Sequence, residues 1–546
     1  MSETVTAQDV EPGSHLPAVI ADARRAAAAA FAVVEVAGFI FYIVAGSRIW
    51  FFRDDWEFLA DRGVNMHDLL RQHGGHFVAL PILVFRAMYY VVGLRSYVPY
   101  QVLPIALHLA AAALLRVIMR RAGVSPWIAT VAASLFVFFG SGSQDILWGF
   151  QIAFTGPLVL GMVQLILADH DGPIDRRDWI GIAAGAAALM CSGVAVAMVA
   201  IVGLTVLIRR GWRGGWRAAA FHTLPLGVAY GAWWLHYSSG SGPTVTKPSV
   251  LIDWVRTGIA GAFDALGQVA FVGWALAIML VAGLVLAWRQ YDATERRRRG
   301  AAISAMLVGA FGFLLISGVN RASLGTHFAS SSRYLHIVAA LLLPSLAVAA
   351  DALIRRRRAF APLVVALFLI GIPGNLAGTS KNFPAKAYFA SYEQMVRSLP
   401  RMTLATRVPR DVRPELVNAP WINVGWLLDG AHSGRIPTTR APTPGERATN
   451  RLRLSLDELD EGSGTACTPV RAPVVRNLVA GDSFVVRGTI LVSTVDEDTG
   501  AQSSLVTYGA SFLVGGRDHT LRDVAGALTI RIVGVGRSGM LCAGSR

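Results

Sequence analysis

Two adjacent carboxylates, Asp54 and Asp55, stand directly after the first long apolar segment of the chain. Neighbouring carboxylates are costly to desolvate at such a place, so they usually have either a partner or a task. One of them could act as a general base, and Arg53 is expected to pair with them or with Glu57. Trp56 also suits the aromatic belt of a membrane interface, which would make the cluster an ordinary solvated collar.

Three further arginines, Arg86, Arg321 and Arg333, are candidates for binding an anion together with Arg53. A guanidinium group can bind phosphate oxygens through two parallel hydrogen bonds. Tyr334 follows Arg333, and we assign it to the same binding site. Contacts with lipid headgroups or a structural ion pair would explain Arg321 and Arg333 equally well.

Polar residues elsewhere could complete a site. His67, His73 and His76 gather in the loop that carries the carboxylates, where they could help to hold a divalent metal ion, although their spacing matches no metal motif. His76 is also a candidate for the wall of a substrate pocket. Asp145 begins an apolar segment and could line the same pocket, although the adjacent Trp148 is typical of an interface belt.

Glu35 lies inside the first apolar segment, where an ionisable residue is a functional candidate by default. The simpler expectation is a hydrogen bond from Glu35 to a neighbouring helix, such as the one that carries His108.

These residues are set in a chain dominated by apolar segments. It has 546 residues, of which 54% are hydrophobic and 16% charged, well below the charged share of about 25% in soluble domains. A bilayer-spanning helix needs about 20 apolar residues. We therefore predict an all-α polytopic membrane protein with about eleven transmembrane helices, at about 27–47, 97–119, 126–142, 146–168, 178–191, 194–208, 217–237, 264–288, 300–318, 335–354 and 359–375.

The net charge of +15 comes from arginine clusters between these segments rather than from one basic face, which argues against nucleic-acid binding. With the N-terminus in the cytoplasm, every cluster falls on the cytoplasmic side. The first segment is expected to be an uncleaved anchor rather than a cleaved signal. The break at Ser192 and Gly193 could separate two tilted helices or interrupt a single long one, which would invert the later topology.

The first outer loop, 48–96, contains an apolar stretch at 77–94 that we interpret as an interfacial helix. Two domains are expected: a membrane domain at 1–375 and an extracytoplasmic domain at 376–546 that is β-rich in its later part, with alternating runs at 483–487 and 528–533. If this tail lies outside the cytoplasm, a disulfide between Cys467 and Cys542 is reasonable. Cys191 is expected to be a packing residue.

The Asp54-Asp55 pair after the first helix, the long first loop and the many-helix core resemble the GT-C superfamily of membrane glycosyltransferases over roughly residues 1–375. The stretch from His76 to Leu94 is similar to the family's passage into the second span. Two features depart from the family: Asp-Asp replaces the frequent Asp-Glu pair, and Trp233-Trp234 is followed by Leu235 rather than by aspartate.

The resemblance implies a multi-pass plasma-membrane enzyme that transfers a sugar from a polyprenyl phosphate to a cell-envelope glycan, glycolipid or protein, with inversion at the anomeric carbon. It implies a base at Asp54 or Asp55 and cations at the lipid phosphate. A divalent metal could take part. The alternatives are a transporter or flippase of a lipid-linked sugar, and a non-catalytic envelope scaffold.

Overall fold

A computed structural model describes residues 15–238, 244–245, 247–415, 418–438, 441–462, 467–496, 498–508, 516–522, 526–535 and 539–543. Two compact units divide the chain between them. The helical unit comprises Met1–Ser47, Leu70–Leu80 and Gln101–Phe383, and the mixed unit comprises Arg48–Leu69, Pro81–Tyr100 and Pro384–Arg546. The first loop is therefore shared between the units, whereas the linear division expected from composition places it with the membrane helices.

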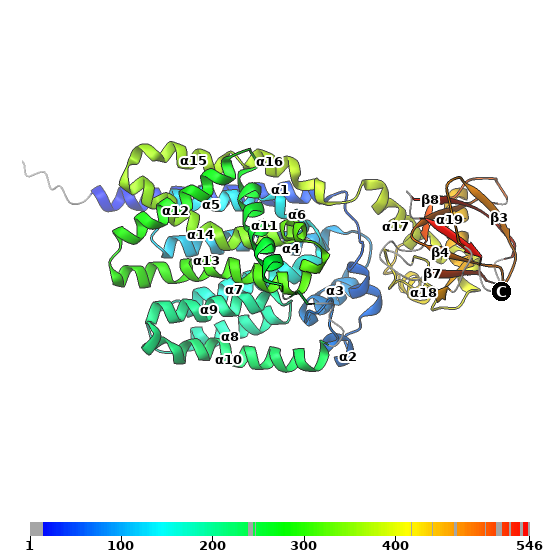
Figure 1. Cartoon of the computed structure of the whole chain (residues 1–546), viewed down its shortest axis with the longest axis horizontal. Coiled ribbons are helices and arrows are strands. Elements are labelled where there is room, and N and C mark those ends of the chain that lie inside the picture. Colours follow the sequence, from blue (N-terminus) through cyan, green and yellow to red (C-terminus); the bar gives the residue numbers. More distant parts are fainter. Residues whose placement is uncertain are drawn as a thin grey trace, which may run out of the picture. The chain divides into compact units, whose positions relative to one another are not determined.

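Helices build the helical unit, and most of them are long and apolar (Figure 1). They are α1 His15–Gly46, α4 Val98–Arg121, α5 Pro126–Val137, α6 Ser143–Leu147, α7 Ile152–Ala168, α8 Arg176–Leu189, α9 Val194–Arg210, α10 Trp212–Tyr237, α11 Pro248–Gly267, α12 Val272–Gln290, α13 Ala293–Arg321, α14 Ser332–Arg356, α15 Ala361–Leu369 and α16 Ile372–Gly378. Helix α14 is buried along most of its length and packs against α5, α11, α12 and α13.

Seven helices in the described part of the chain are long and apolar enough to cross a membrane, and the bent pair formed by α5 and α6 with its preceding turn would make an eighth. The coarse prediction of a helical membrane protein agrees with this architecture. Each of the eleven predicted segments is largely helical. However, α8, α9 and α10 are not among the seven helices that are long and apolar enough to cross a membrane.

Two segment predictions need correction. The segment predicted at 264–288 is not one helix, because Gln268 and Phe271 have φ angles of 57° and 67° and separate α11 from α12. Left-handed residues of this kind terminate helices. In the segment predicted at 126–142 the α-helix ends at Val137. The chain then bends by 41° between this helix and the helical segment Gly140–Leu147, which contains α6.

The break at Ser192 and Gly193 separates two helices that run in opposite directions. Arg209, near the end of α9, contacts Asp169 and Asp171 just before α8, at 2.8 and 3.0 Å. The end of α9 therefore returns to the start of α8, as expected for a helical hairpin. Of the two expectations for this break, the pair of helices is confirmed.

The mixed unit combines helices with two antiparallel sheets. Its helices are α2 Met66–Leu70, α3 Ala79–Val91, α17 Lys386–Ser398, α18 Val424–His432 and α19 Pro444–Ser455, of which α2 and α3 reach into the Leu70–Leu80 segment of the helical unit. The strands are β1 Leu456–Gly462, β2 Cys467–Pro469, β3 Val474–Leu478, β4 Ser483–Arg487, β5 Ile490–Thr494, β6 Val506–Tyr508, β7 Gly516–Leu521, β8 Leu528–Gly534 and β9 Met540–Ala543. The predicted strands at 483–487 and 528–533 are confirmed.

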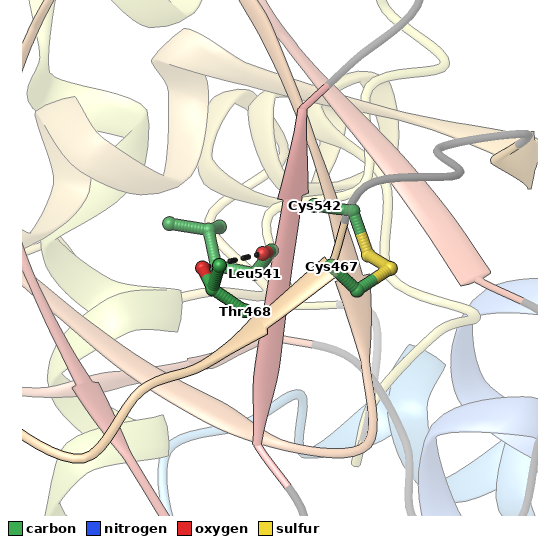
Figure 2. Close-up of a disulfide and its surroundings, with 4 residues drawn as sticks. All are labelled: Cys467, Thr468, Leu541 and Cys542. Carbon is green, nitrogen blue, oxygen red and sulfur yellow. Dashed lines mark hydrogen bonds between the residues drawn. A yellow bond between two sulfur atoms is a disulfide. The ribbon is translucent and has the colours of Figure 1, made fainter.

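The strand orders are β1-β7-β4-β9-β2 and β3-β8-β5-β6. Phe484 and Leu541 from the first sheet share one buried core with Ile490 and Ile532 from the second, so the sheets pack face to face. Cys467 and Cys542 are partners on adjacent strands and form a disulfide, which confirms the predicted bond (Figure 2). Beside it, the Thr468 hydroxyl donates to the Leu541 carbonyl at 3.3 Å.

Candidate functional site

A cavity of about 770 Å³ lies in the helical unit, between α8, α9, α10 and α13 and the segment that leads into α3. Apolar side chains form much of its wall, among them Leu189, Val194, Ala197, Val199, Leu226 and Phe313. Three of the residues predicted from sequence also line it: His76, Arg321 and Tyr334. The cavity therefore combines an apolar wall with a cationic and hydrogen-bonding part.

A tight turn presents His76 to the cavity. His73 and His76 exchange two backbone hydrogen bonds of 2.9 Å across Gly74 and Gly75, whose φ angles are 55° and 87°. Only glycine adopts such angles without strain, so the Gly-Gly pair makes the turn possible.

The ring of His76 is held in one tautomer. The Gly193 backbone N–H donates to His76 Nδ1 at 3.3 Å, which leaves the proton of the neutral ring on Nε2. Burial, together with the positive charges of Arg321 and Arg333, lowers the pKa of His76 to about 3. His76 is therefore a neutral hydrogen-bond donor at neutral pH.

Two arginines contribute positive charge near this ring. Arg321 ends α13, and its Nη2 donates to the Gly74 carbonyl at 2.7 Å, which ties the guanidinium to the turn. Arg333 lies in the first turn of α14, with its guanidinium 5.7 Å from the centre of the Tyr334 ring. Within the described residues neither arginine forms an ion pair with a carboxylate, so both charges remain available to an anion.

Comparison with known proteins adds no function to this geometry. The chain matches no protein-family model and no curated protein. What the cavity binds must therefore be inferred from its lining. An apolar wall beside the Arg321 guanidinium group fits a ligand that is itself part hydrocarbon and part anion.

The carboxylate pair belongs to the mixed unit, and its two members differ. Asp55 is fully buried, and its Oδ2 accepts hydrogen bonds from the Phe52 N–H at 3.1 Å and from the Tyr97 hydroxyl at 2.9 Å. These bonds hold a turn in which Arg53 has a φ of 49°. Asp54 is half-buried. Asp55 therefore shapes the loop, whereas Asp54 is the more accessible carboxylate.

The remaining candidates of the first loop have local structural contacts. Arg53 is exposed, whereas Glu57 pairs with Arg62 at 2.9 Å. Of the carboxylates expected to pair with Arg53, which are Asp54, Asp55 or Glu57, the last is bonded to Arg62 instead. Arg86 belongs to the mixed unit too, and its Nη1 donates to the Leu59 carbonyl at 2.6 Å.

Asp145 is fully buried in the helical unit, and its Oδ2 lies 3.2 Å from His336 Nδ1. His336 Nε2 in turn lies 2.9 Å from His108 Nδ1. The expected hydrogen bond between Glu35 and the helix of His108 is not formed: Glu35 Oε1 has no partner among the described residues. Sequence reasoning missed His336, although its place three residues after Arg333 on an apolar helix was a usable signal.

The histidines of the first loop do not assemble a metal site. His67 is exposed and lies 3.4 Å from Asp68, whereas His73 packs against the Phe150 ring. Over the described ranges, no group of three or more His, Cys, Asp or Glu side chains is arranged to hold a metal ion. The first-loop histidines therefore give no support to metal-assisted chemistry.

Proposed function

We propose that this chain is a membrane glycosyltransferase whose donor is a sugar linked to a polyprenyl phosphate. The observation that carries the proposal is the cavity that combines an apolar wall with Arg321, His76 and Tyr334. An isoprenoid chain suits the wall, and the phosphate suits the guanidinium groups. The acceptor would be a cell-envelope glycan, glycolipid or protein on the extracytoplasmic side.

The proposed reaction needs a base and a stabilised leaving group. The acceptor hydroxyl oxygen attacks the anomeric carbon, its proton passes to a carboxylate, and the bond from that carbon to the phosphate oxygen breaks. Negative charge grows on the departing lipid phosphate, where Arg321 and Arg333 would stabilise it. Neutral His76 would donate from Nε2 to a sugar or phosphate oxygen.

We assign the base to Asp54, because Asp55 already accepts two hydrogen bonds that hold the loop. A carboxylate committed in this way gains less from taking a substrate proton, since protonation would weaken both bonds.

The arginines test the donor site. With purified protein and a polyprenyl-phosphate sugar, Arg321→Ala should lower transfer by about 10²–10³-fold, and Arg321→Lys should restore only part of it. Arg256→Ala is the matched control, because Arg256 is 77% exposed on α11 and pairs with Asp253 at 3.4 Å. Unchanged transfer and lipid-phosphate binding in both Arg321→Ala and Arg333→Ala would overturn the assignment.

The carboxylates test the catalytic role. Asp54→Asn should insert and express normally and lose transfer by about two to four orders of magnitude. Asp429→Asn, an exposed carboxylate of the mixed unit paired with Arg410, should retain transfer. Near-normal transfer by Asp54→Asn would remove the proposed base.

The proposed enzyme has a GT-C-like arrangement of eleven spans, with a cytoplasmic N-terminus and an external C-terminus. We leave α11 out of this count because Asp253, Arg256 and Asp264 interrupt its apolar residues. Reporter fusions after Arg217, Arg299 and Arg358 should read cytoplasmic, and a fusion at the C-terminus should read external. A cytoplasmic C-terminus would contradict this topology.

A transporter of the same lipid-linked sugar is the second candidate, favoured by the bend between α5 and α6. Interrupted helices with buried ionisable residues are typical of transporters, and Asp145 lies on the shorter arm of this bend. Reconstituted vesicles separate the two functions: an enzyme forms a new glycosidic bond, whereas a transporter moves the lipid-linked sugar between leaflets without one.

A further inference from the structure

Asp145, His336 and His108 form a buried chain across three helices of the helical unit, α6, α14 and α4. All three side chains are fully buried. The Asp145 Oδ2 to His336 Nδ1 distance is 3.2 Å, and the His336 Nε2 to His108 Nδ1 distance is 2.9 Å. At the far end, His108 Nε2 lies 3.1 Å from the Val137 carbonyl oxygen. The proposed glycosyl transfer uses none of these groups.

The hydrogen-bond directions along this chain can be assigned from its fixed end. A carbonyl oxygen only accepts, so His108 Nε2 must carry a proton. In neutral His108, Nδ1 is then an acceptor, and the hydrogen bond must come from His336 Nε2. Neutral His336 would therefore present an unprotonated Nδ1 to Asp145.

That arrangement is unfavourable if Asp145 is ionised. A carboxylate oxygen and an unprotonated ring nitrogen would lie 3.2 Å apart in a fully buried site. Neither oxygen of Asp145 has a hydrogen-bond partner among the described residues, so no hydrogen bond stabilises the charge. An isolated buried carboxylate is among the most costly groups to bury. One added proton, on either Asp145 or His336, removes the conflict.

The surroundings offer little competing charge. Arg333 is the charged side chain whose field acts on Asp145, and the Tyr42 ring meets His108 edge-on at 5.5 Å. Within their bounds, α5 and α7 contain no ionisable residue, and α6 contains Asp145 alone. Asp22 and Glu35 on α1 and Asp351 on α14 are the other carboxylates of α1, α4, α5, α6, α7 and α14, and Asp351 is bonded to Arg355.

We propose that Asp145 and His336 together form a proton-binding site that holds one proton at neutral pH. The pair is then electrically neutral as a unit, either as a carboxylic acid beside a neutral imidazole or as a carboxylate beside an imidazolium. His108 accepts the hydrogen bond from His336 Nε2 and so fixes which nitrogen of neutral His336 carries the proton. The site links α6, on the short arm of the bend, to α14 and α4.

Vibrational and magnetic resonance spectra of the full-length protein in lipid nanodiscs test this site. At pH 7, either a protonated-carboxyl band that disappears in Asp145→Asn or an imidazolium ¹⁵N signal that disappears in His336→Gln is expected. Asp351→Asn is the control and should leave both signals intact, because Asp351 accepts from Arg355 at 2.6 Å and from the Ser125 N–H at 2.9 Å.

A second measurement tests the proposal without any substitution, so it does not depend on whether the variants fold. Wild-type protein with ¹³C-labelled aspartate and ¹⁵N-labelled histidine reports both groups without substitution. A wild-type spectrum with neither a protonated aspartate nor an imidazolium at pH 7 would overturn the proposal and leave Arg333 as the compensating charge. This result is independent of whether the chain transfers sugar.

Discussion

At the scale of single residues, the two adjacent carboxylates have separate roles. Asp55 is enclosed and bonded to Phe52 and Tyr97, while half-buried Asp54 is the more accessible of the two. Sequence predicted the pair but not the difference between its members. The tautomer of His76 could not be predicted from sequence either, because it depends on the Gly193 N–H, which lies 117 positions away along the chain.

Tyr97→Phe tests the structural role of Asp55. The variant removes the hydroxyl donor 2.9 Å from Asp55 Oδ2 and leaves a buried carboxylate one bond short, so we expect a loss of about 1.5–3 kcal/mol in the free energy of unfolding. Thermal and denaturant unfolding in detergent measure it. Tyr90→Phe, at a ring that is 54% exposed, should change stability little, and equal losses in both variants would argue against the proposed role.

His76 gives a pH prediction. Its pKa falls from 6.5 in the unfolded chain to about 3 in the folded protein, because burial disfavours the charged ring. A lowered histidine pKa contributes stability that is present above pH 6.5 and is lost as the pH falls toward 3. Between pH 6.5 and pH 4.5, the wild type should therefore lose more stability than His76→Gln, by at most about 1.4 kcal/mol per pH unit. Parallel losses in melting temperature for the two proteins would contradict this.

At the scale of elements, breaks between helices create the sites. The turn between α8 and α9 brings Gly193 to His76, and the bend after α5 carries Asp145 to α14. Sequence marked the first break at Ser192 and Gly193, but the second lies within the continuous apolar segment predicted at 126–142. The left-handed residues between α11 and α12 were also not predicted, because neither Gln268 nor Phe271 is a typical turn residue.

Gly193→Ala tests the hairpin turn. An added Cβ would lie 2.9 Å from His76 Nδ1, so the ring must move or the turn must open. We expect a loss of about 1–3 kcal/mol in stability and weaker binding of polyprenyl phosphate. Gly312→Ala on α13 is the control, because its Cβ would meet nothing within 4 Å and alanine favours the helix. If Gly193→Ala changed neither the binding of polyprenyl phosphate nor the melting temperature, close packing between Gly193 and His76 would be contradicted.

At the scale of the whole molecule, two compact units share the first loop. The carboxylates belong with the C-terminal sheets and helices, and the cavity belongs with the apolar helices. A disulfide in the sheet region fits an oxidising compartment outside the cytoplasm, in agreement with the proposed topology.

The disulfide gives a prediction at this scale. Trapping of free thiols should leave Cys467 and Cys542 unmodified until reductant is added, with a shift in mobility on reduction. Cys467→Ser with Cys542→Ser should lose the shift and about 2–4 kcal/mol of stability in the sheet region, because the bond closes a long loop. Cys191→Ala, which removes the free buried cysteine, should keep the shift. Both thiols reacting without reductant would contradict the bond.

The sequence by itself determined the class of each segment, because the length of an apolar run and the period of its alternation are local properties. It thus predicted the helical core, the strands at 483–487 and 528–533, and a disulfide between the two cysteines of the polar tail. Only the tertiary structure decided which side chains meet. Gly193 reaches His76 across 117 positions, and His336 reaches His108 across 228. Such contacts depend on which helix faces pack together, and neither composition nor spacing along one segment records that choice.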